Sequence, residues 1–569
     1  MVYVNSASLL CIIIVLVLSL YRLAMAGGKI QTEAHENSFL VKHERLIVAF
    51  LLLIGFVICV FAFPDGFMQD EAMSSYDAKS LLIHGYDHHG ITWPVHMYAW
   101  GTSEQSAFLI YYLIPFIKLF GMNEVSVRVA AVILSMIGAI FFWLLLRSAF
   151  GKEIGIIALI VCLLNPWHFV QSHFALDCNA FPHLFIIGFF LLHLFAKNDK
   201  RKYLWLGIVF MGLCQYGYAV SLYCVPVFLV LVAIYFVRNK IVTIKEVLIS
   251  MGIYLVTSGP LFATMILNVL GVQEDIHLGP FTLPAFVENE RAGDILFFVD
   301  DKLDFFIRNI KYIFGITILQ QEYVPWDNVE HFGTAFLCMV PVAVIGFVYT
   351  WYKATKRDEN SRFFSMVLFW FIMALCEGVV TNLSGLIRRF NIFYYVQIIF
   401  IVIGIRCIWN ASKRLFAITM AVYLAMGALL VFDFATVYQR SFYVPEASSR
   451  YVLDAAYRMK DIECDRYYIT PDTAWPGSKD VTEIWVLFAF DLDSDYVLGN
   501  TQNSYDRHFD HGYEEQFVYS RADQIDSIDA DNAYLYFVNA DDKDLFSEDT
   551  FDSYQYGAYY LMIPKWMNG

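Results

Sequence analysis

Charged residues and paired cysteines are both scarce in this sequence. Only 16% of the 569 residues are charged and 58% are hydrophobic, whereas an average globular chain carries about 25% charged residues. The ten cysteines are scattered without a CxxC pair, and the region beyond residue 440 contains only Cys464. Neither a disulfide framework nor a thiolate metal site is indicated, so we interpret the cysteines as small apolar residues.

Positive charge is scarce as well. The chain has 39 Lys and Arg against 54 Asp and Glu, a net charge of −15. A negative chain without a basic face repels phosphate backbones, so nucleic acid is excluded as a partner. Internal repeats, which are common in transporters, are also absent from the sequence.

Long apolar runs account for the missing charge. Crossing roughly 30 Å of hydrocarbon requires about 20 apolar residues, and such runs recur up to about residue 433. They predict a polytopic α-helical protein of the cell membrane with about twelve spans. We place these near 8–25, 46–63, 125–146, 153–170, 180–196, 203–217, 220–237, 247–267, 334–352, 363–380, 392–408 and 415–433.

Lys and Arg in the short loops predict the side of the membrane for each loop, because basic loops resist translocation. Alternation of the spans puts every basic loop in the cytosol. These loops carry Arg147, Lys152, Lys197, Lys200, Arg201, Lys202, Arg238, Lys240, Lys245, Lys353, Lys356, Arg357, Arg362, Lys413 and Arg414. The segments near 64–124, 171–179, 271–333, 381–391 and 434–569 are then extracytoplasmic.

The first span has two interpretations. Ala24-Met25-Ala26 is similar to a signal-peptidase site. However, no positive charge precedes the apolar core, and Arg22 follows it. We therefore favour a retained first helix.

The composition changes after about residue 440, where acidic residues accumulate. A helix is expected over 446–460, followed by strands over 466–470, 483–490, 533–539 and 559–564, which predicts a small α/β domain. The predicted organisation is an N-terminal helix and cytosolic loop (1–45), a transmembrane catalytic domain (46–433) with outer loops 64–124 and 271–333, and an extracytoplasmic α/β domain (434–569).

Most polar residues outside this domain lie in the outer loops. Asp70 and Glu71 directly follow a span, where paired carboxylates suit a general base that meets a lipid-borne and an aqueous substrate. A solvated turn that caps the next helix explains them equally well. His88 and His89 in the same loop are possible ligands of a divalent metal, although their spacing matches no zinc signature.

Two further polar segments lie between spans. Asp177, in the segment 165–179, sits beside apolar residues at the outer bilayer edge, where a carboxylate must be paired or used. Arg388 and Arg389 lie on the predicted outer side, against the positive-inside tendency, and could hold an anion. A structural pair with Glu377 would explain these arginines without a substrate.

The order of these motifs resembles the GT-C glycosyltransferases, in particular the bacterial family 39 group that is related to protein O-mannosyltransferases and the lipid A aminoarabinose transferase. The resemblance covers roughly residues 60–410. The motifs that carry it are Asp70-Glu71, Tyr76-Asp77-Ala78, Gly85-Tyr86-Asp87, Trp100-Gly101, Glu104-Gln105-Ser106-Ala107, Tyr111-Tyr112-Leu113, Pro115, Leu119-Phe120-Gly121, Asn123-Glu124, Arg128, Asn165-Pro166-Trp167-His168, Asp177-Cys178-Asn179, Pro325-Trp326-Asp327-Asn328, Phe332-Gly333 and Arg388-Arg389-Phe390-Asn391.

This resemblance implies a GT-C-like fold and an inverting transfer of a sugar from a polyprenyl-phosphate donor to an extracytoplasmic glycan, lipid or protein acceptor. Asp70 would be the base, with Glu71 and Asp177 assisting it. Arg388 and Arg389 would bind the donor phosphate. The residues expected to line the cavity are Tyr76, Glu104, Asn179 and Asn391.

The resemblance requires no cofactor and leaves a divalent metal possible. The sequence departs from the family pattern at Ser74 and Ser75, where a basic residue is common, and at Gln105-Ser106, where Lys-Pro is common. Both departures remove expected phosphate contacts. The alternative functions are a transporter or flippase for a lipid-linked or polar substrate, and an envelope scaffold.

Overall fold

The computed structural model describes residues 1–25, 39–64, 66–100, 102–286, 293–321, 323, 328–356, 361–384, 386–437, 445–473, 479–505 and 507–568. Among the sequence motifs, Ala26, Asp65, Gly101 and Pro325-Trp326-Asp327 lie outside the described residues. The chain divides into two compact units. The helical unit comprises Met1–Phe63, Ala131–Phe262 and Glu290–Tyr438, and the mixed unit comprises Pro64–Ala130, Ala263–Asn289 and Gln439–Gly569.

This division differs from the predicted domain boundaries. The first outer loop and part of the second belong to the same compact unit as the C-terminal segment, rather than to the transmembrane domain. Contacts between segments hundreds of residues apart create this grouping. One example is the indole of Trp485, which donates a hydrogen bond to the carbonyl of Phe67 at 3.1 Å.

Ten helices in the described part of the chain are long and apolar enough to cross a membrane, and the chain is an integral multi-pass membrane protein. Helices suit apolar sequences there because every backbone group is satisfied within the segment. The ten candidate spans are Tyr3–Arg22, Glu44–Phe61, Glu124–Phe150, Asp177–Asn198, Ser221–Arg238, Ile244–Val269, Leu337–Ala354, Ser361–Val380, Ile387–Ala411 and Lys413–Thr436.

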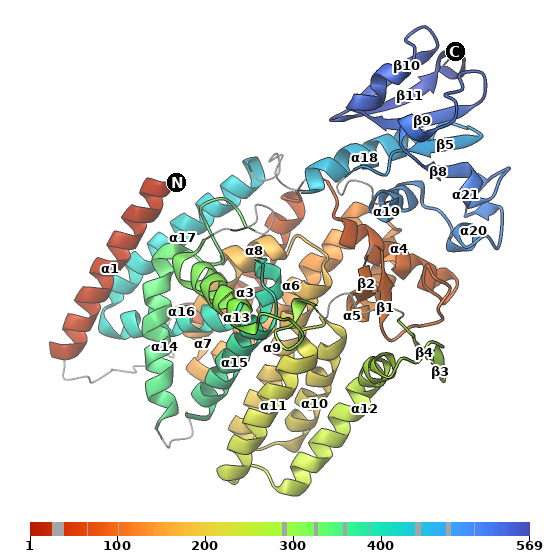
Figure 1. Ribbon diagram of the computed structural model, residues 1–569. Helices are drawn as coiled ribbons and strands as arrows, with labels where there is room; N and C mark the ends of the chain where they lie inside the picture. The colour runs from red at the N-terminus through yellow and green to blue at the C-terminus, as the bar shows by residue number, and fades with distance from the viewer. Residues whose placement is uncertain are drawn as a thin grey trace. The chain divides into compact units, whose positions relative to one another are not determined.

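The helices that carry these spans, and the others between residues 1 and 436, are shown in Figure 1. Their bounds are α1 (Val2–Met25), α2 (Phe39–Lys42), α3 (Glu44–Phe61), α4 (Gln69–Ile83), α5 (Ala107–Phe120), α6 (Glu124–Phe150), α7 (Lys152–Leu163), α8 (Pro166–Gln171), α9 (Asp177–Asn198), α10 (Arg201–Leu213), α11 (Ser221–Arg238), α12 (Ile244–Val269), α13 (Lys302–Phe314), α14 (Val340–Ala354), α15 (Ser361–Val380), α16 (Asn391–Ala411) and α17 (Lys413–Thr436).

Two of the twelve predicted spans form shorter helices. The predicted span 153–170 divides into α7 and α8, because Pro166 cannot donate the backbone hydrogen bond that would continue α7 and instead begins α8. The predicted span 203–217 ends as α10 at Leu213, where a 3₁₀ turn over Cys214–Tyr216 follows. Each helix is shorter than the roughly 20 residues of a complete crossing.

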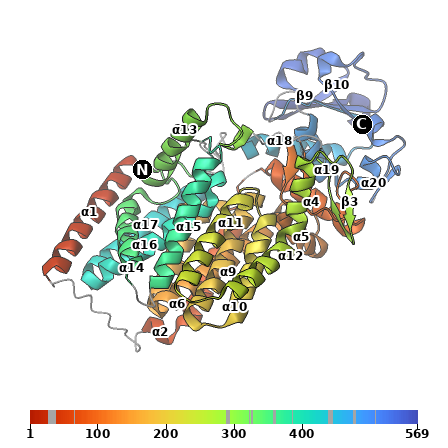
Figure 2. The same cartoon turned by 60° about the horizontal axis from the view of Figure 1, so that its bottom comes forward.

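The centre of the helical unit is formed by α9 and α16, in which 89% of the span residues are buried. Helix α16 packs against α14, α15 and α17 (Figures 1 and 2). The α14–α16 contact depends on glycine, since a Cβ at Gly346 would lie 1.8 Å from the carbonyl oxygen of Phe400. Small residues at such crossings let helix backbones approach closely.

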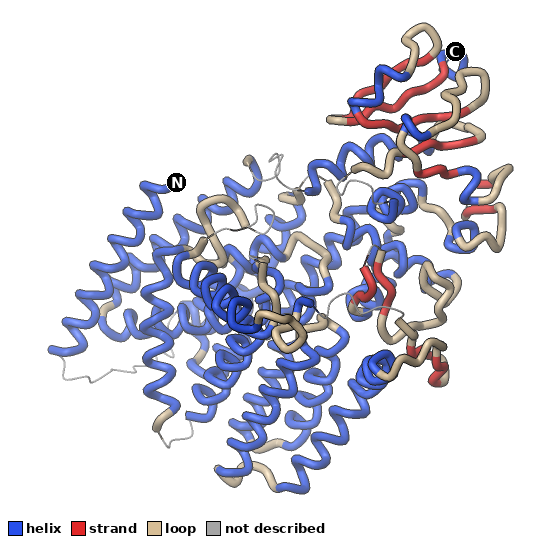
Figure 3. Tube along the Cα trace, in the orientation of Figure 1, coloured by secondary structure: helices blue, strands red, loops and turns tan. Residues whose placement is uncertain are grey.

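The mixed unit combines short helices with sheets (Figure 3). Its first loop contains α4, α5 and the hairpin β1–β2 (Met97–Ala99, Thr102–Gln105), and its second contributes the hairpin β3–β4 (Ile276–Leu278, Phe281–Leu283). The C-terminal segment adds helices α18 (Pro445–Lys460), α19 (Lys479–Phe490), α20 (Ser494–Val497) and α21 (Tyr513–Gln516), and the small hairpin β6–β7 (Asn503–Ser504, Arg507–His508).

A five-stranded sheet in the order β10-β11-β9-β5-β8 organises this segment. Its strands are β5 (Arg466–Ile469), β8 (Phe517–Tyr519), β9 (Tyr534–Asn539), β10 (Phe551–Tyr556) and β11 (Tyr559–Pro564). Strand β5 pairs in parallel with β8 and β9, whereas β9, β11 and β10 pair antiparallel. The predicted α/β architecture of the C-terminal segment is therefore confirmed.

One predicted strand of this segment is wrong. Residues 483–490 belong to α19 rather than to the sheet. The residues from Ile484 to Phe490 are all buried, so the run is apolar on every side. Periodicity cannot separate a buried strand from a buried helix in such a short continuous run.

Candidate functional site

Asp70 and Glu71 lie in the first turn of α4 but face different surroundings. The Asp70 side chain is exposed, while Glu71 is completely buried. The Glu71 Oε2 accepts a hydrogen bond from the backbone N–H of Met68 at 3.1 Å and lies 3.2 Å from the Arg128 guanidinium. Successive helix residues are turned by about 100°, and this rotation separates the two predicted carboxylates.

Arg128 on α6 fixes the start of α4. Besides its ion pair with Glu71, its guanidinium donates to the carbonyls of Pro64 at 2.5 Å and Gly66 at 2.7 Å. Arg128 is itself only 2% exposed. This buried pair holds the turn at the start of α4, directly before Asp70.

A second group of side chains, which we call the His88 cluster, consists of Tyr76, Asp77, Asp87, His88 and Trp100. His88 Nδ1 lies 2.6 Å from the Asp77 carboxylate, and the His88 ring stacks on the Trp100 ring with centroids 4.3 Å apart. Five buried polar atoms of the cluster have no hydrogen-bond partner among the described residues. They are Tyr76 OH, Asp77 Oδ2, Asp87 Oδ2, His88 Nε2 and Trp100 Nε1.

Burial shifts the proton affinities of this cluster. Burial together with the charge of Asp77 raises the pKa of Asp87 to about 7. Burial opposes protonation of His88, but the charge and hydrogen bond of Asp77 outweigh it and raise the His88 pKa above its ordinary value. Burial also raises the pKa of Tyr76, so its hydroxyl keeps its proton. The cluster thus combines hydrogen-bond donors, carboxylate acceptors and an aromatic face, the groups that recognise a polar ligand.

The two positions where the sequence departs from its family pattern meet in space. Gln105 Nε2 donates a hydrogen bond to Ser74 Oγ at 2.9 Å, and both side chains are buried. A neutral hydrogen bond therefore replaces two expected cations at one place. Nearby in the same hairpin, Glu104 Oε2 lies 3.4 Å from His96 Nε2.

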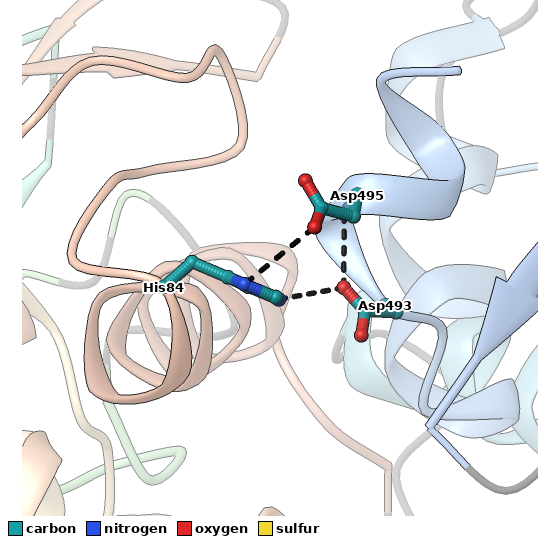
Figure 4. Close-up of side chains that lie close together, drawn as sticks. All are labelled: His84, Asp493 and Asp495. Atoms are coloured by element: carbon teal, nitrogen blue, oxygen red, sulfur yellow. Dashed lines mark hydrogen bonds and ion pairs between the residues drawn. The ribbon is translucent and has the colours of Figure 1, made fainter. Parts of the chain in front are cut away.

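A possible metal site was predicted at His88 and His89. Neither histidine belongs to a group of three potential ligands within the described residues. His84, Asp493 and Asp495 form such a group (Figure 4). However, His84 Nε2 lies 2.7 Å from Asp493 Oδ1, and Tyr86 donates a hydrogen bond to Asp495. These contacts connect the first loop to the C-terminal segment without requiring an ion.

Two predicted cavity residues of the helical unit form a saturated network, which we call the Asn391 cluster, with Trp167. Asn391 Nδ2 donates to Asn179 Oδ1 at 2.9 Å and to the Cys178 carbonyl at 3.1 Å. The Trp167 indole donates to Asn391 Oδ1 at 2.8 Å. Asn179 Nδ2 donates to two further backbone carbonyls. The amides of Asn179 and Asn391 thus hold α8, α9 and α16 together.

Asp177 is the first residue of α9 and is partly exposed. Its carboxylate accepts a hydrogen bond from the backbone N–H of Cys178 at 2.6 Å. A carboxylate at this end of a helix is also stabilised by the helix dipole. In the sequence, Asp177 lies two positions before Asn179 of the Asn391 cluster.

Arg388 and Arg389 lie in a 3₁₀ turn, Ile387–Phe390, immediately before α16. Arg389 forms an ion pair with Asp294 at 3.1 Å and donates to the carbonyl of Asn382 at 2.7 Å. Among the described residues the salt bridge of Arg389 is thus with Asp294, and its charge acts on the predicted partner Glu377 only at longer range. Glu377 is completely buried in α15.

The structure distributes the predicted residues over both units. Asp70, Glu71, Tyr76, Glu104, His88 and His89 belong to the mixed unit, whereas Asp177, Asn179, Arg388, Arg389 and Asn391 belong to the helical unit. Sequence reasoning missed the Asp77–His88 pair and the Glu71–Arg128 pair. The close spacing of Asp77, Asp87 and His88 was the available signal for the first, and the second joins residues 57 positions apart.

Comparisons with known proteins agree with this architecture. Residues 105–263 match the family model described as dolichyl-phosphate-mannose-protein mannosyltransferase. The crystal structure of ArnT from Cupriavidus metallidurans bound to undecaprenyl phosphate is similar, with a TM-score of 0.53, 12% identity and coverage of 92% of this chain and 98% of that one.

The oligosaccharyltransferase of Archaeoglobus fulgidus in complex with Zn and sulfate is also similar, with a TM-score of 0.50, 12% identity and coverage of 90% and 73%, respectively. No curated protein sequence matches. The structural likeness confirms the predicted GT-C fold.

Proposed function

This chain has the GT-C glycosyltransferase fold, and on that premise we propose that it transfers a sugar from a polyprenyl-phosphate donor to an acceptor outside the cytosol. Nucleotide sugars are made in the cytosol, so transfer on the outer side needs a lipid-borne donor. The ArnT structure with undecaprenyl phosphate and the mannosyltransferase family match support this donor class.

The observation that carries the proposal is the His88 cluster. A protein seldom leaves several buried polar atoms without partners, and each such atom calls for a ligand or water. A sugar ring presents hydroxyls to carboxylates, imidazole and phenol, and an apolar face to an indole. The cluster lies in the same loop as Asp70, the proposed base.

In the proposed reaction the acceptor hydroxyl attacks the anomeric carbon while the bond from that carbon to the donor phosphate oxygen breaks. Asp70 accepts the hydroxyl proton, and the configuration inverts. Asp177 positions the acceptor, and Glu71 keeps the Asp70 turn in place. The leaving polyprenyl phosphate is stabilised by positive charge, for which Arg388 and Arg389 are the candidates.

The neutral Ser74–Gln105 pair bears on where the phosphate binds. No cation remains at these two positions, so phosphate binding there is disfavoured. Binding of the donor phosphate would then depend on Arg388 and Arg389 rather than on the positions of Ser74 and Gln105. Replacing both with alanine should raise the apparent KM for donor, because a lost charge-assisted contact costs about 1.5–3 kcal/mol. Asp294→Asn is the control that frees Arg389 from its pair, and it should not weaken donor binding.

The orientation is part of the proposal. A reporter fused after Gly569 should be active only outside the cytosol, and one inserted after Lys356 only inside. Both reporters on one side would contradict the loop assignment and the extracytoplasmic site.

The deciding experiment measures release of polyprenyl phosphate from a synthetic donor by the purified protein. Asp70→Asn keeps the size of the side chain but removes the base, so turnover should fall by roughly 10²–10⁴. Donor binding should persist. Asp549→Asn, an exposed carboxylate of the C-terminal segment, is the matched control and should retain full turnover.

Two outcomes would change the assignment. Normal turnover in Asp70→Asn together with loss in a folded Glu71→Gln protein would make Glu71 the base. Full turnover in both variants would contradict the catalytic role of this loop.

A further inference from the structure

A cavity of about 350 Å³ lies within the helical unit, and its lining includes none of the residues of the proposed reaction. Its walls are the C-terminal ends of α6, α9, α14 and α16 and the first turn of α15. Its volume falls in the range of ligand pockets, about 300–1,000 Å³. The loops that border these helix ends are the ones predicted to be cytosolic.

Positive charge dominates the lining of this cavity. Lys197, Lys353, Arg362 and Arg406 each come from a different helix, and the described residues that line the cavity include no carboxylate. Within the described part of the chain, none of these four cations forms an ion pair. Four like charges around one cavity repel one another. An anion bound in the cavity would offset this electrostatic repulsion.

The general enrichment of Lys and Arg in cytosolic loops does not account for this arrangement. Loop cations normally extend into water, whereas Lys353, Arg362 and Arg406 are partly buried. The Arg362 guanidinium donates to the Ala196 carbonyl at 2.8 Å, and the Arg406 guanidinium lies 4.7 Å from the centre of the Phe150 ring. These contacts hold the cations on the cavity walls.

Neutral donors complete the lining. Ser148 Oγ lies 3.1 Å from His193 Nε2, and the Lys197 ammonium donates to the Ser148 carbonyl at 2.5 Å. Two guanidinium groups, two ammonium groups and a hydroxyl offer more donors than a carboxylate can accept. A phosphate group has the oxygens to use them, and guanidinium binds it through paired hydrogen bonds.

We propose that this cavity binds a phosphate-bearing anion, either the headgroup of an anionic phospholipid or a soluble phosphate compound. Basic pockets between membrane helices at the cytoplasmic side suit lipid headgroups, and the same donors suit a free phosphate. The site would be separate from the donor-phosphate arginines, so it goes beyond the proposed transfer reaction.

The test uses the purified full-length protein in a neutral detergent at constant ionic strength. Thermal unfolding is followed while inorganic phosphate, pyrophosphate or phosphatidylglycerol in mixed micelles is added. A ligand that binds the folded protein raises the unfolding midpoint in a saturable way. At least one of the three probes should do so.

The informative variant is Lys353→Gln combined with Arg406→Gln. Neither side chain donates a hydrogen bond to an acceptor among the described residues, so the change removes two charges and their contacts with the Tyr349 and Phe150 rings without breaking a hydrogen bond. The apparent Kd should rise at least about tenfold, the effect of losing one charge-assisted contact. If the double variant does not fold, Arg406→Gln alone carries the test.

The matched control is Lys202→Gln combined with Arg414→Gln. It removes the same charge from exposed positions of the same predicted side, outside the cavity, and should leave the Kd unchanged. A response to soluble phosphates identifies a free phosphate site, and a response to phosphatidylglycerol alone identifies a headgroup site. No saturable response to any probe, or equal weakening in both double variants, overturns the proposal.

Discussion

The Asn391 cluster and the His88 cluster bury polar side chains in opposite ways. In the Asn391 cluster, Asn179, Asn391 and Trp167 exchange hydrogen bonds with one another and with backbone carbonyls. In the His88 cluster, five buried polar atoms lack a partner within the described residues. A satisfied network inside a membrane bundle specifies one packing. An unsatisfied cluster outside the spans leaves its donors and acceptors available for a ligand or water.

From this contrast we infer which of the polar residues singled out in the sequence serve the fold and which serve the proposed reaction. Asn179 and Asn391, which were expected to line a cavity, hold three helices together through hydrogen bonds. Tyr76, expected in the same role, keeps an unpartnered hydroxyl. Substitutions in the first cluster should therefore act on stability and substitutions in the second on activity.

The largest effect is expected outside both clusters, at the pair that holds the Asp70 turn. Glu71→Gln leaves the Arg128 guanidinium as a buried charge without its counter-ion, which costs about 3–5 kcal/mol. Thermal unfolding of the purified protein measures this loss. Asp70→Asn, one residue away and exposed, should unfold like the unmodified protein. Equal midpoints for both variants would remove Glu71 from the positioning role.

The next largest effect is expected in the Asn391 cluster, where the polar groups have hydrogen-bond partners. Asn391→Ala leaves the Trp167 N–H without its acceptor and leaves Asn179 Oδ1 with only the weak donor of the Cys178 thiol, and a buried group that loses its partner costs about 1–3 kcal/mol. The unfolding midpoint should drop while the turnover per folded molecule stays within about twofold. Turnover lost at an unchanged midpoint would place Asn391 in the site rather than in the scaffold.

Tyr76→Phe is the corresponding test in the His88 cluster, where activity rather than stability should change. Removing a hydroxyl that has no described partner should leave stability within about 0.5 kcal/mol, as for substitutions without a stabilising contact. If the hydroxyl binds substrate, kcat/KM should fall about tenfold, the value of one hydrogen bond to a ligand. A large loss of stability with full activity would show that the hydroxyl serves the fold.

The last expectation is a pH dependence of stability in the mixed unit. The pKa of Asp87 is raised from 3.8 to about 7, so between these values the folded protein holds a proton that the unfolded chain has lost. Stability should therefore decrease as pH rises from about 4 to 7 and level off above that window. The raised pKa of His88 acts in the same direction, because stability from its protonated form is lost as pH rises through its folded value.

Unfolding midpoints measured from pH 4 to 9 test this expectation. In Asp87→Asn the decline should be shallower by a few degrees, since about 1 kcal/mol moves the midpoint by roughly 2–4 °C. Asp549→Asn should keep the slope of the unmodified protein. An unchanged slope in Asp87→Asn would show that Asp87 titrates near its ordinary pKa.

The sequence by itself determined the parts of this protein that depend on local composition. Ten of the twelve predicted spans became helices of sufficient length, because apolarity over about 20 residues is a local property. The two exceptions have local causes as well, the proline at position 166 and the 3₁₀ turn after Leu213. Strands rich in aromatic and β-branched residues, such as Arg466–Ile469, were predictable for the same reason.

Only the tertiary structure decided the roles of individual polar side chains. Asp70 and Glu71 are adjacent and chemically alike, yet one is exposed and the other meets Arg128, because the packing of α4 fixes which way each points. Asn179 and Asn391 are 212 positions apart, and the four cations of the basic cavity come from four helices. Such meetings depend on how helices pack against one another, and the free energy of that packing comes from contacts that no local stretch of sequence contains.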